Sequence, residues 1–269
     1  MTNTQNIWDP DLHIPGKSVI TRGVSVFLFG GIGTIKTTWA GSWPSPIFLS
    51  VGYEGGDDSL AMLPQVLGIE TPPVYHIDST KKMRDKVNYI CLNHKKYGWK
   101  TVVIDSVTFY TDVYIREVIE VYQRKNLAPQ MQKRDWAFLE AHICKELAQR
   151  LHGTNLNVIW IALSKDKWSS ASPQGERHLE GVVPMMQGAA ATKLPAMCKM
   201  VIYADKELVP APTGMISRPV FYTAPTLLTK DVRHKYGNAF PEGQLVDPQH
   251  GTWPTFRALD ERIGQFVYK

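Results

Sequence analysis

The stretch that decides the fold reads FGGIGTIKTT and spans residues 29–38. It nearly matches the phosphate-binding pattern GxxxxGK[ST], in which glycines let successive backbone N–H groups wrap a phosphate. The lysine of this pattern reaches the β- and γ-phosphates, and the hydroxyl after it is a ligand of Mg²⁺. A plain glycine-rich turn, the alternative reading, would not need the Lys36-Thr37 pair. The candidate nucleotide-binding residues are Gly30, Gly31, Ile32, Gly33, Thr34, Ile35, Lys36, Thr37 and Thr38.

One residue of this stretch departs from the pattern. Ile35 occupies the position before the lysine, where the pattern has glycine. A β-branched side chain there would crowd the phosphate or distort the loop, and strained dihedral angles would cost about 1–3 kcal/mol. We therefore expect this position to lower the affinity for phosphate without abolishing it.

Short apolar runs surround the loop. Residues 24–29 (VSVFLF) precede it, and residues 46–51 (PIFLSV) follow after a brief helical link. Similar runs predict buried strands at 74–77, 101–104 and 157–162, each preceded by a stretch that can be helical. Buried strands that alternate with helices are typical of a parallel sheet. We expect an α/β domain with a mainly parallel central sheet flanked by helices.

The clearest helix signal lies between residues 133 and 151. Apolar side chains recur there every three or four positions, charged residues fill the opposite face, and Gly153 is a plausible stop. The spacing predicts one amphipathic helix. Its apolar positions are Trp136, Leu139, Ile143, Leu147 and Leu151.

An acidic residue ends the apolar run at 101–104. Asp105 stands where a carboxylate beside the hydroxyl of Thr37 would help to hold Mg²⁺. Many buried strands end in aspartate, so the pattern gains its weight only from the loop upstream. We predict Thr37 and Asp105 as the magnesium-linked residues.

A second acid is needed to orient water for hydrolysis, because Ser106 is not a carboxylate. Glu54 follows the run at 46–51, whose strand we expect next to the loop strand, so its carboxylate would reach the γ-phosphate. Asp57 and Asp58 are competing candidates. A solvated acid in a turn is the alternative.

Composition bounds the class of protein. The chain has 269 residues, of which 43% are hydrophobic and 20% charged, enough for one α/β core that needs neither disulfides nor a structural metal. Its three cysteines are far apart and show no CxxC spacing, which argues against a zinc site. No apolar run approaches a membrane span, and the first residues lack a signal-peptide layout. We expect a soluble protein of the cytoplasm, whose formal charge of +5 permits a polyanionic partner without requiring one.

Four segments together carry a resemblance to a known family. LFGGIGTIKTTWA, FLSVGYEGGDDSL, TVVIDSVTFY and NVIWIALSKDKW resemble the RecA-like branch of P-loop ATPases. Within that branch, the chain is most similar to phage-encoded AAA-domain proteins related to Sak-type single-strand annealing and recombination factors. The resemblance runs from about Val24 to Phe240, and its first and third segments are the specific ones.

The resemblance implies a RecA-like P-loop NTPase core that binds ATP and Mg²⁺. Lys36 and Thr37 would hold the triphosphate and the metal, and Asp105 would be the acid on the metal side. Glu54 matches the family's water-activating glutamate. Leu163 stands where the family has a polar sensor, with Ser164 as a weak substitute, which puts the coupling between nucleotide state and DNA binding in doubt.

The resemblance also implies assembly. Residues 229–233 (TKDVR) are similar to the family's late basic motif, whose cations reach into the nucleotide site of a neighbouring subunit. Lys230 and Arg233 would then offset charge that develops on the γ-phosphate, so hydrolysis would depend on a ring or filament. Surface charges on a turn are the alternative.

A location for DNA follows from the same resemblance. In RecA-like folds, the loop after the sensor strand lines the path of single-stranded DNA, and this loop corresponds to residues 164–183. Cations neutralise phosphates there, and an aromatic ring stacks on a base, which is worth about 1–3 kcal/mol. A solvated loop is the alternative, as it is for the lysine-rich helix at 81–100. The candidate DNA-binding residues are Lys165, Lys167, Trp168 and Arg177.

We expect an irregular arm at 1–23, a RecA-like ATPase domain at 24–245 and a C-terminal extension at 246–269 packed on the core. The expected function is ATP binding and hydrolysis on single-stranded DNA during phage recombination, annealing or replication, in the host cytoplasm. The expected partners are single-stranded DNA, further copies of the chain and phage replication or recombination proteins, and no membrane. One alternative is a nucleotide-binding scaffold or loader that does not hydrolyse ATP. Another is an ATPase that acts on a protein partner.

Overall fold

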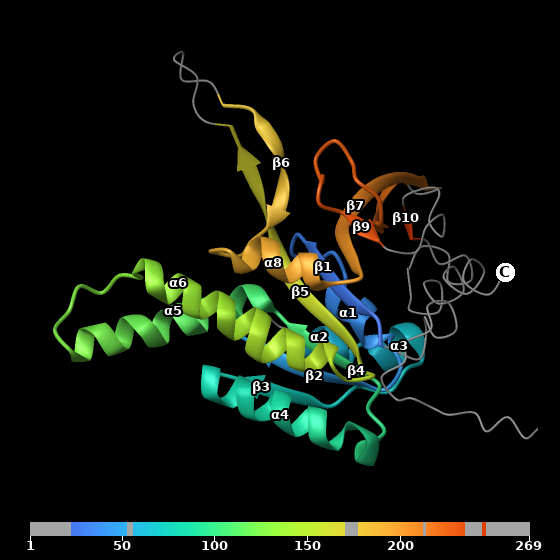
Figure 1. The fold of residues 1–269 in the computed structure, drawn as a ribbon. Helices are drawn as coiled ribbons and strands as arrows, with labels where there is room; N and C mark the ends of the chain where they lie inside the picture. The colour runs from blue at the N-terminus through green and yellow to red at the C-terminus, as the bar shows by residue number, and fades with distance from the viewer. Residues whose placement is uncertain (1–22, 53–55, 170–176, 212–213, 235–243, 246–269) are drawn as a thin grey trace, which may run out of the picture.

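The computed structural model describes residues 23–52, 56–169, 177–211, 214–234 and 244–245 (Figure 1). The predictions of an N-terminal arm and a C-terminal extension fall on residues 1–22 and 246–269, which lie outside the described residues. Glu54 also lies outside them.

Strands and helices alternate as the apolar runs predict. In chain order, the strands are β1 (Ser25–Gly30), β2 (Pro46–Val51), β3 (Val74–Ile77), β4 (Thr101–Asp105), β5 (Asn157–Trp168), β6 (Leu179–Pro184), β7 (Met200–Ala211), β8 (Gly214–Tyr222), β9 (Arg233–His234) and β10 (Gln244–Leu245). The helices are α1 (Lys36–Gly41), α2 (Gly56–Ala61), α3 (Leu63–Leu67), α4 (Thr80–Tyr97), α5 (Val107–Arg124), α6 (Lys133–Glu140), the π-helical η1 (Ala141–Ala148), α7 (Gln149–His152) and α8 (Ala190–Met197). Within the described ranges, none of the helices has the length and apolar character that crossing a bilayer requires.

The central sheet is mainly parallel, which confirms the predicted fold class. Its strands are arranged in the order β10-β8-β7-β1-β5-β4-β2-β3. Neighbours from β7 to β3 pair in parallel, whereas β8 pairs antiparallel with β7 and β10 with β8. The expectation that β2 lies next to the loop strand β1 is wrong. A strand has two hydrogen-bonding edges, and β5 and β7 occupy both edges of β1.

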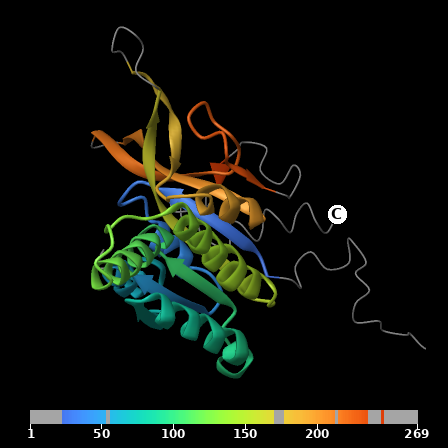
Figure 2. The ribbon, with the colours of Figure 1, turned by 60° about the vertical axis from the view of Figure 1, so that its left-hand side comes forward.

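Two hydrophobic cores cover the two faces of the sheet. Successive side chains of a strand point to opposite faces, so Phe27 and Phe29 join the core beneath α4, α5 and η1. Val26 and Leu28 join the core beneath α1, α2 and α3. Figures 1 and 2 show these two groups of helices on opposite sides of the sheet. Because the strands are buried on both faces, they read as continuous apolar runs in the sequence.

The helix predicted at 133–151 is present as α6, η1 and α7 in succession. Leu139, Ile143, Leu147 and Leu151 are fully buried, as their spacing predicts. The middle of this helix is π-helical between Ala141 and Ala148, a widening that the sequence pattern did not indicate.

The segment expected to be a functional loop forms a β-hairpin instead. β5 continues past the sheet to Trp168, and β6 returns antiparallel to it, with Ser164 opposite Pro184. Figures 1 and 2 show this β5–β6 hairpin projecting away from the body of the domain. The expectation of a loop at 164–183 is therefore wrong for its described part, because the backbone groups of residues 164–168 pair with those of β6. Residues 170–176 lie outside the described ranges.

Candidate nucleotide-binding site

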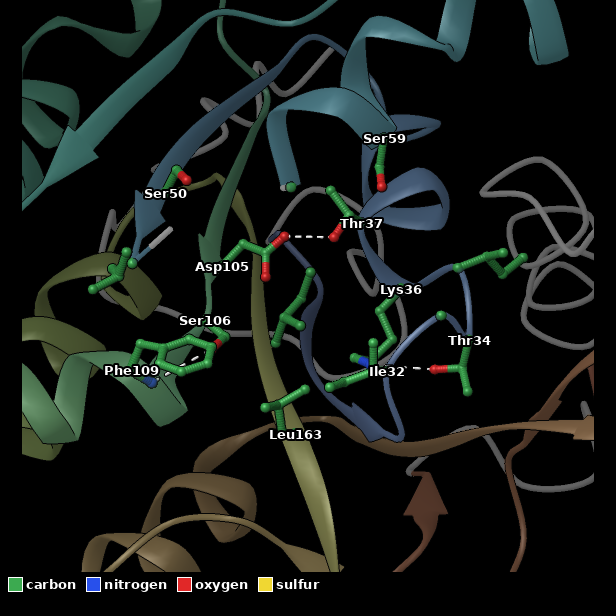
Figure 3. Close-up of a pocket in the computed structure, with 16 residues that line it drawn as sticks. Ile32, Thr34, Lys36, Thr37, Ser50, Ser59, Asp105, Ser106, Phe109 and Leu163 are labelled. Atoms are coloured by element: carbon green, nitrogen blue, oxygen red, sulfur yellow. Dashed lines mark hydrogen bonds between the residues drawn. The ribbon is translucent and has the colours of Figure 1, made fainter. Parts of the chain in front are cut away.

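The loop after β1, the carboxyl ends of β2 and β4 and the middle of β5 surround a pocket of about 240 Å³ (Figure 3). Most of the loop predicted from sequence lines this pocket, together with Asp105 at the end of β4. Ligands of open α/β sheets bind at this edge of the sheet. The side chains and backbone around the pocket come from Ile32, Gly33, Thr34, Ile35, Lys36, Thr37, Ser50, Val51, Gly52, Gly56, Ser59, Asp105, Ser106, Phe109, Ile161 and Leu163.

Two glycines of the loop have structural reasons to be glycine: at Gly30 another strand's backbone comes close, and at Gly33 the backbone is left-handed. A Cβ at Gly30 would lie 2.2 Å from the backbone oxygen of Ala204 on β7, a distance that no side chain allows. Gly33 has a φ of 72°, in the left-handed region that favours glycine. Gly30 therefore excludes any side chain and Gly33 favours glycine, both for reasons independent of any ligand.

Ile35 takes the backbone conformation of the glycine that it replaces. Its φ of 58° and ψ of 19° are left-handed, which is rare for a β-branched residue. The expected strain at this position is present. The Ile35 side chain packs against the core that contains Trp39 and Leu60, so part of it lies away from the space where a phosphate would bind.

The Lys36 ammonium is held by its own loop. It donates hydrogen bonds to the backbone oxygens of Gly30 (3.0 Å) and Gly31 (2.6 Å) and to Thr34 Oγ1 (3.2 Å). The residue is only 7% exposed. Thr34 in turn donates to the Gly31 oxygen at 2.8 Å, so these contacts fix the loop around the ammonium.

Thr37 and Asp105 lie together although 68 positions separate them in sequence. The Thr37 hydroxyl donates to Asp105 Oδ2 at 2.6 Å (Figure 3). Burial raises the pKa of the Asp105 carboxyl above its ordinary value, while the hydrogen bond from Thr37 and the charge of Lys36 lower it. The structure therefore brings together, beside Lys36, the hydroxyl and the carboxylate that the sequence predicts as the magnesium-linked groups.

Several pocket residues were not predicted from sequence. Ser50 comes from β2, Ser59 from α2 and Phe109 from the first turn of α5. Leu163 also lines the pocket, and its backbone N–H donates to Thr108 Oγ1 at 2.9 Å. Ser50 and Phe109 stand close in sequence to predicted strand ends, which was the only available signal for them.

Other predicted residues lie away from this pocket. Lys230 and Arg233 do not line it, and the backbone of Arg233 pairs with Val201, the second residue of β7. Glu54 cannot be placed, since it lies outside the described residues, but Gly52 and Gly56 on either side of it both line the pocket.

The predicted DNA-binding residues gather on the β5–β6 hairpin. Lys165, Lys167 and Trp168 are exposed on the outer part of β5, and Arg177 is exposed just before β6. The Lys167 ammonium pairs with Glu180 across the hairpin at 3.0 Å. The structure thus brings these residues together on one projecting element, separate from the phosphate pocket.

A family model described as an AAA domain matches residues 22–230. The match covers well over half of the chain and includes the loop, Asp105 and the β5–β6 hairpin. Among curated proteins, none matches the chain.

Proposed function

This chain belongs to the AAA domain family of nucleotide-binding ATPases, and we propose that it hydrolyses ATP and acts on single-stranded DNA. The observation that carries the proposal is the Thr37–Asp105 hydrogen bond of 2.6 Å at the floor of a pocket that also contains Lys36. An ammonium, a hydroxyl and a carboxylate, three groups that a triphosphate and its metal need, are thereby held at one edge of the sheet by the start of α1 and the end of β4.

The triphosphate would bind in the loop after β1. The backbone N–H groups of residues 33–37 would hold its phosphates, because a loop that leads into a helix N-terminus offers unpaired N–H donors. The Lys36 ammonium would exchange its contacts with the oxygens of Gly30 and Gly31 for phosphate oxygens. That exchange favours the phosphate, since a charge-assisted hydrogen bond to an anion is stronger than one to a neutral carbonyl.

The donor set at Thr37 and Asp105 fits Mg²⁺. Both groups offer oxygen ligands, which this ion prefers, and it is usually held by one or two carboxylates and the substrate phosphates. When bound, the ion would neutralise charge on the β- and γ-phosphates. Asp105 ionises more readily beside the Lys36 charge than its burial alone would allow.

Glu54 is the residue proposed to orient the attacking water. Gly52 and Gly56 line the phosphate pocket and also a larger adjoining hollow of about 980 Å³. In the sequence, one residue separates Glu54 from each of these two glycines. A carboxylate there would accept a proton from water during attack on the γ-phosphate.

The β5–β6 hairpin is proposed to bind single-stranded DNA. One continuous strand links the two sites, because Ile161 and Leu163 of β5 line the phosphate pocket while Lys165, Lys167 and Trp168 of the same strand are exposed on the hairpin. The Trp168 ring is 53% exposed, enough to stack on a base. The resemblance to phage recombination and annealing proteins favours that biological setting.

Neighbouring copies are proposed to complete the site. The exposed Ile32 at the tip of the loop, 77% accessible, is the kind of apolar group that a second subunit would cover. Lys230 and Arg233 do not line the phosphate pocket of their own chain, and the proposal is that they contact the γ-phosphate of a neighbouring copy.

Phosphate release with and without a poly-dT oligonucleotide tests the proposal. Lys36→Ala should abolish nucleotide binding and hydrolysis, because the loop loses its only buried cation. Glu54→Gln should bind ATP like the parent chain and hydrolyse it far more slowly, since an amide does not accept the proton. Lys100→Ala, which removes a lysine before β4, is the control. Hydrolysis unchanged in both site variants would refute the assignment, and a parent chain that binds ATP without releasing phosphate would support the scaffold alternative.

A further inference from the structure

A lysine of β7 lies against the outer side of the phosphate loop. β7 pairs in parallel with β1, and Ala204 is level with Gly30, the last residue of β1. β7 continues beyond that point, so Lys206, two residues later and on the same face as Ala204, overhangs the loop. The ammonium of Lys206 lies only 2.9 Å from the place where a Cβ of Gly33 would stand.

The Lys206 ammonium has no ion pair or hydrogen bond within the part of the chain that the structure describes. The acids beside it in sequence are engaged elsewhere. Asp205 accepts from the Tyr203 hydroxyl at 3.1 Å and from the Lys206 backbone N–H at 2.8 Å. Glu207 accepts from the Tyr222 hydroxyl at 2.6 Å and pairs with Arg218. A cation without a partner, beside a loop that already contains Lys36, lacks a compensating negative charge.

An anion in the loop would supply that charge. The backbone around Gly33 is the part of such loops that encloses the phosphates of a nucleotide, and the lysine after it reaches the β- and γ-phosphates. Lys36 lies inside the loop, bonded to the oxygens of Gly30 and Gly31. Lys206 does not line the pocket, but its ammonium reaches Gly33 of the same loop from the neighbouring strand, so two ammonium groups lie at this loop.

We propose that Lys206 is a second cation that contacts the phosphates of the bound nucleotide, supplied by the same chain from β7. The inference rests on the nucleotide site proposed above and adds a residue to it. A lysine is suited to this position because its long stem carries a compact charge that can follow a phosphate oxygen. Its removal should weaken binding without disturbing the fold, since the side chain is exposed and β7 is held by its pairing with β1 and β8.

Titration calorimetry with ATP and Mg²⁺ tests the inference on four chains. Lys206→Met keeps the apolar stem and removes the charge, and we expect its Kd for ATP to rise about tenfold or more, as for loss of one charge-assisted contact. Lys206→Arg should retain most of the affinity. Lys95→Met, on α4, removes the same charge from a distant helix and should leave the Kd unchanged. Thermal unfolding without nucleotide should be alike in all four chains.

The outcomes separate the inference from the site on which it rests. Equal ATP affinity in the Lys206→Met and Lys95→Met variants would overturn the phosphate contact while leaving the nucleotide site intact. An unfolding temperature lowered in Lys206→Met but not in Lys206→Arg, without any change in Kd, would assign the lysine a structural role and overturn it too. A parent chain that binds no ATP would overturn the nucleotide site together with this inference.

Discussion

Ile35 shows how the loop accommodates a residue that its pattern excludes. Its left-handed backbone, with φ 58° and ψ 19°, costs an L-residue about 1–2 kcal/mol. Its side chain packs against the core around Trp39 and Leu60, and burial of apolar surface offsets part of that cost. The loop therefore keeps the conformation of a phosphate-binding turn at some expense in stability.

Substitution of Ile35 by glycine and by alanine separates strain from packing. Both variants lose the side chain beyond Cβ that packs against the core, but only Ile35→Gly relieves the left-handed conformation. We expect Ile35→Gly to be more stable than Ile35→Ala by about 1 kcal/mol, measured by urea denaturation. Equal stabilities would show that this backbone conformation carries no strain.

Some residues of the site were predictable and others were not. Lys36, Thr37 and Asp105 could be predicted because the pattern fixes their chemistry, and in the structure all three line one pocket. Ser59, and Lys206 as the residue proposed to contact the phosphates, could not, since their places depend on where α2 and β7 pack, which no local pattern encodes. Glu54 stays a prediction.

The first half of β5 is a buried strand of the sheet, and its second half is exposed in the β5–β6 hairpin. The outer half of β5 is polar, and its partner β6 lies beyond the next turn of the chain. Residues 157–162 could be predicted as a strand because they are continuously apolar, whereas polar residues paired with a distant segment look like a loop. The hairpin thus escaped prediction for a physical reason, namely that residues 165–168 of β5 are all exposed and show no apolar run.

Trp168 provides the test of this hairpin as a DNA-binding element. Trp168→Ala should weaken binding of a poly-dT oligonucleotide by about 1–3 kcal/mol, the worth of one stacked base, as measured by fluorescence anisotropy. Lys165→Ala should also reduce the dependence of affinity on salt, because it removes a phosphate contact. Phe138→Ala on α6, which removes another exposed ring (60% accessible), is the control. A parent chain without affinity for DNA at low salt would favour the protein-partner alternative.

A half-buried histidine at the end of α7 makes stability depend on pH. Burial, with the charge of Lys199, lowers the pKa of His152 to about 4, and its neutral Nε2 accepts a hydrogen bond from Trp160 at 3.3 Å. In the unfolded chain the pKa is about 6.5, so the unfolded state binds more protons between pH 6.5 and 4. Stability must therefore fall as the pH falls through this interval.

Between pH 7 and pH 5, this one histidine should lower the free energy of unfolding by about 2 kcal/mol. Urea denaturation at the two pH values measures the loss. His152→Gln keeps an acceptor for Trp160 without a titratable ring, and its loss over the same interval should be smaller by that amount. An identical loss in both chains would contradict the assignment.

Strand order is the property of the whole molecule that the sequence did not reveal. The apolar runs predicted five parallel strands correctly, but each run fits several positions in a sheet. The insertion of β5 between β1 and β4 comes from packing across the entire domain. Asp105 nevertheless reaches Thr37 across that strand, because both lie at the carboxyl edge.

Mixing of inactive variants tests assembly. A chain with Lys36→Ala lacks a working phosphate loop but keeps Lys230 and Arg233. A chain with both Lys230→Ala and Arg233→Ala keeps the phosphate loop but lacks the two cations. If these cations act on a neighbour's nucleotide, the mixture should hydrolyse ATP faster than either variant alone. A mixture no more active than the sum of its parts would restrict Lys230 and Arg233 to their own chain.

The most direct test of the account is calorimetric titration of the parent chain with ATP in millimolar Mg²⁺, beside the Lys36→Ala variant. The pocket formed by the loop, Thr37 and Asp105 predicts saturable heat with one nucleotide per chain, which the variant lacks. No heat of binding in the parent chain, or equal binding in the variant, would contradict the assignment of this pocket to a nucleoside triphosphate.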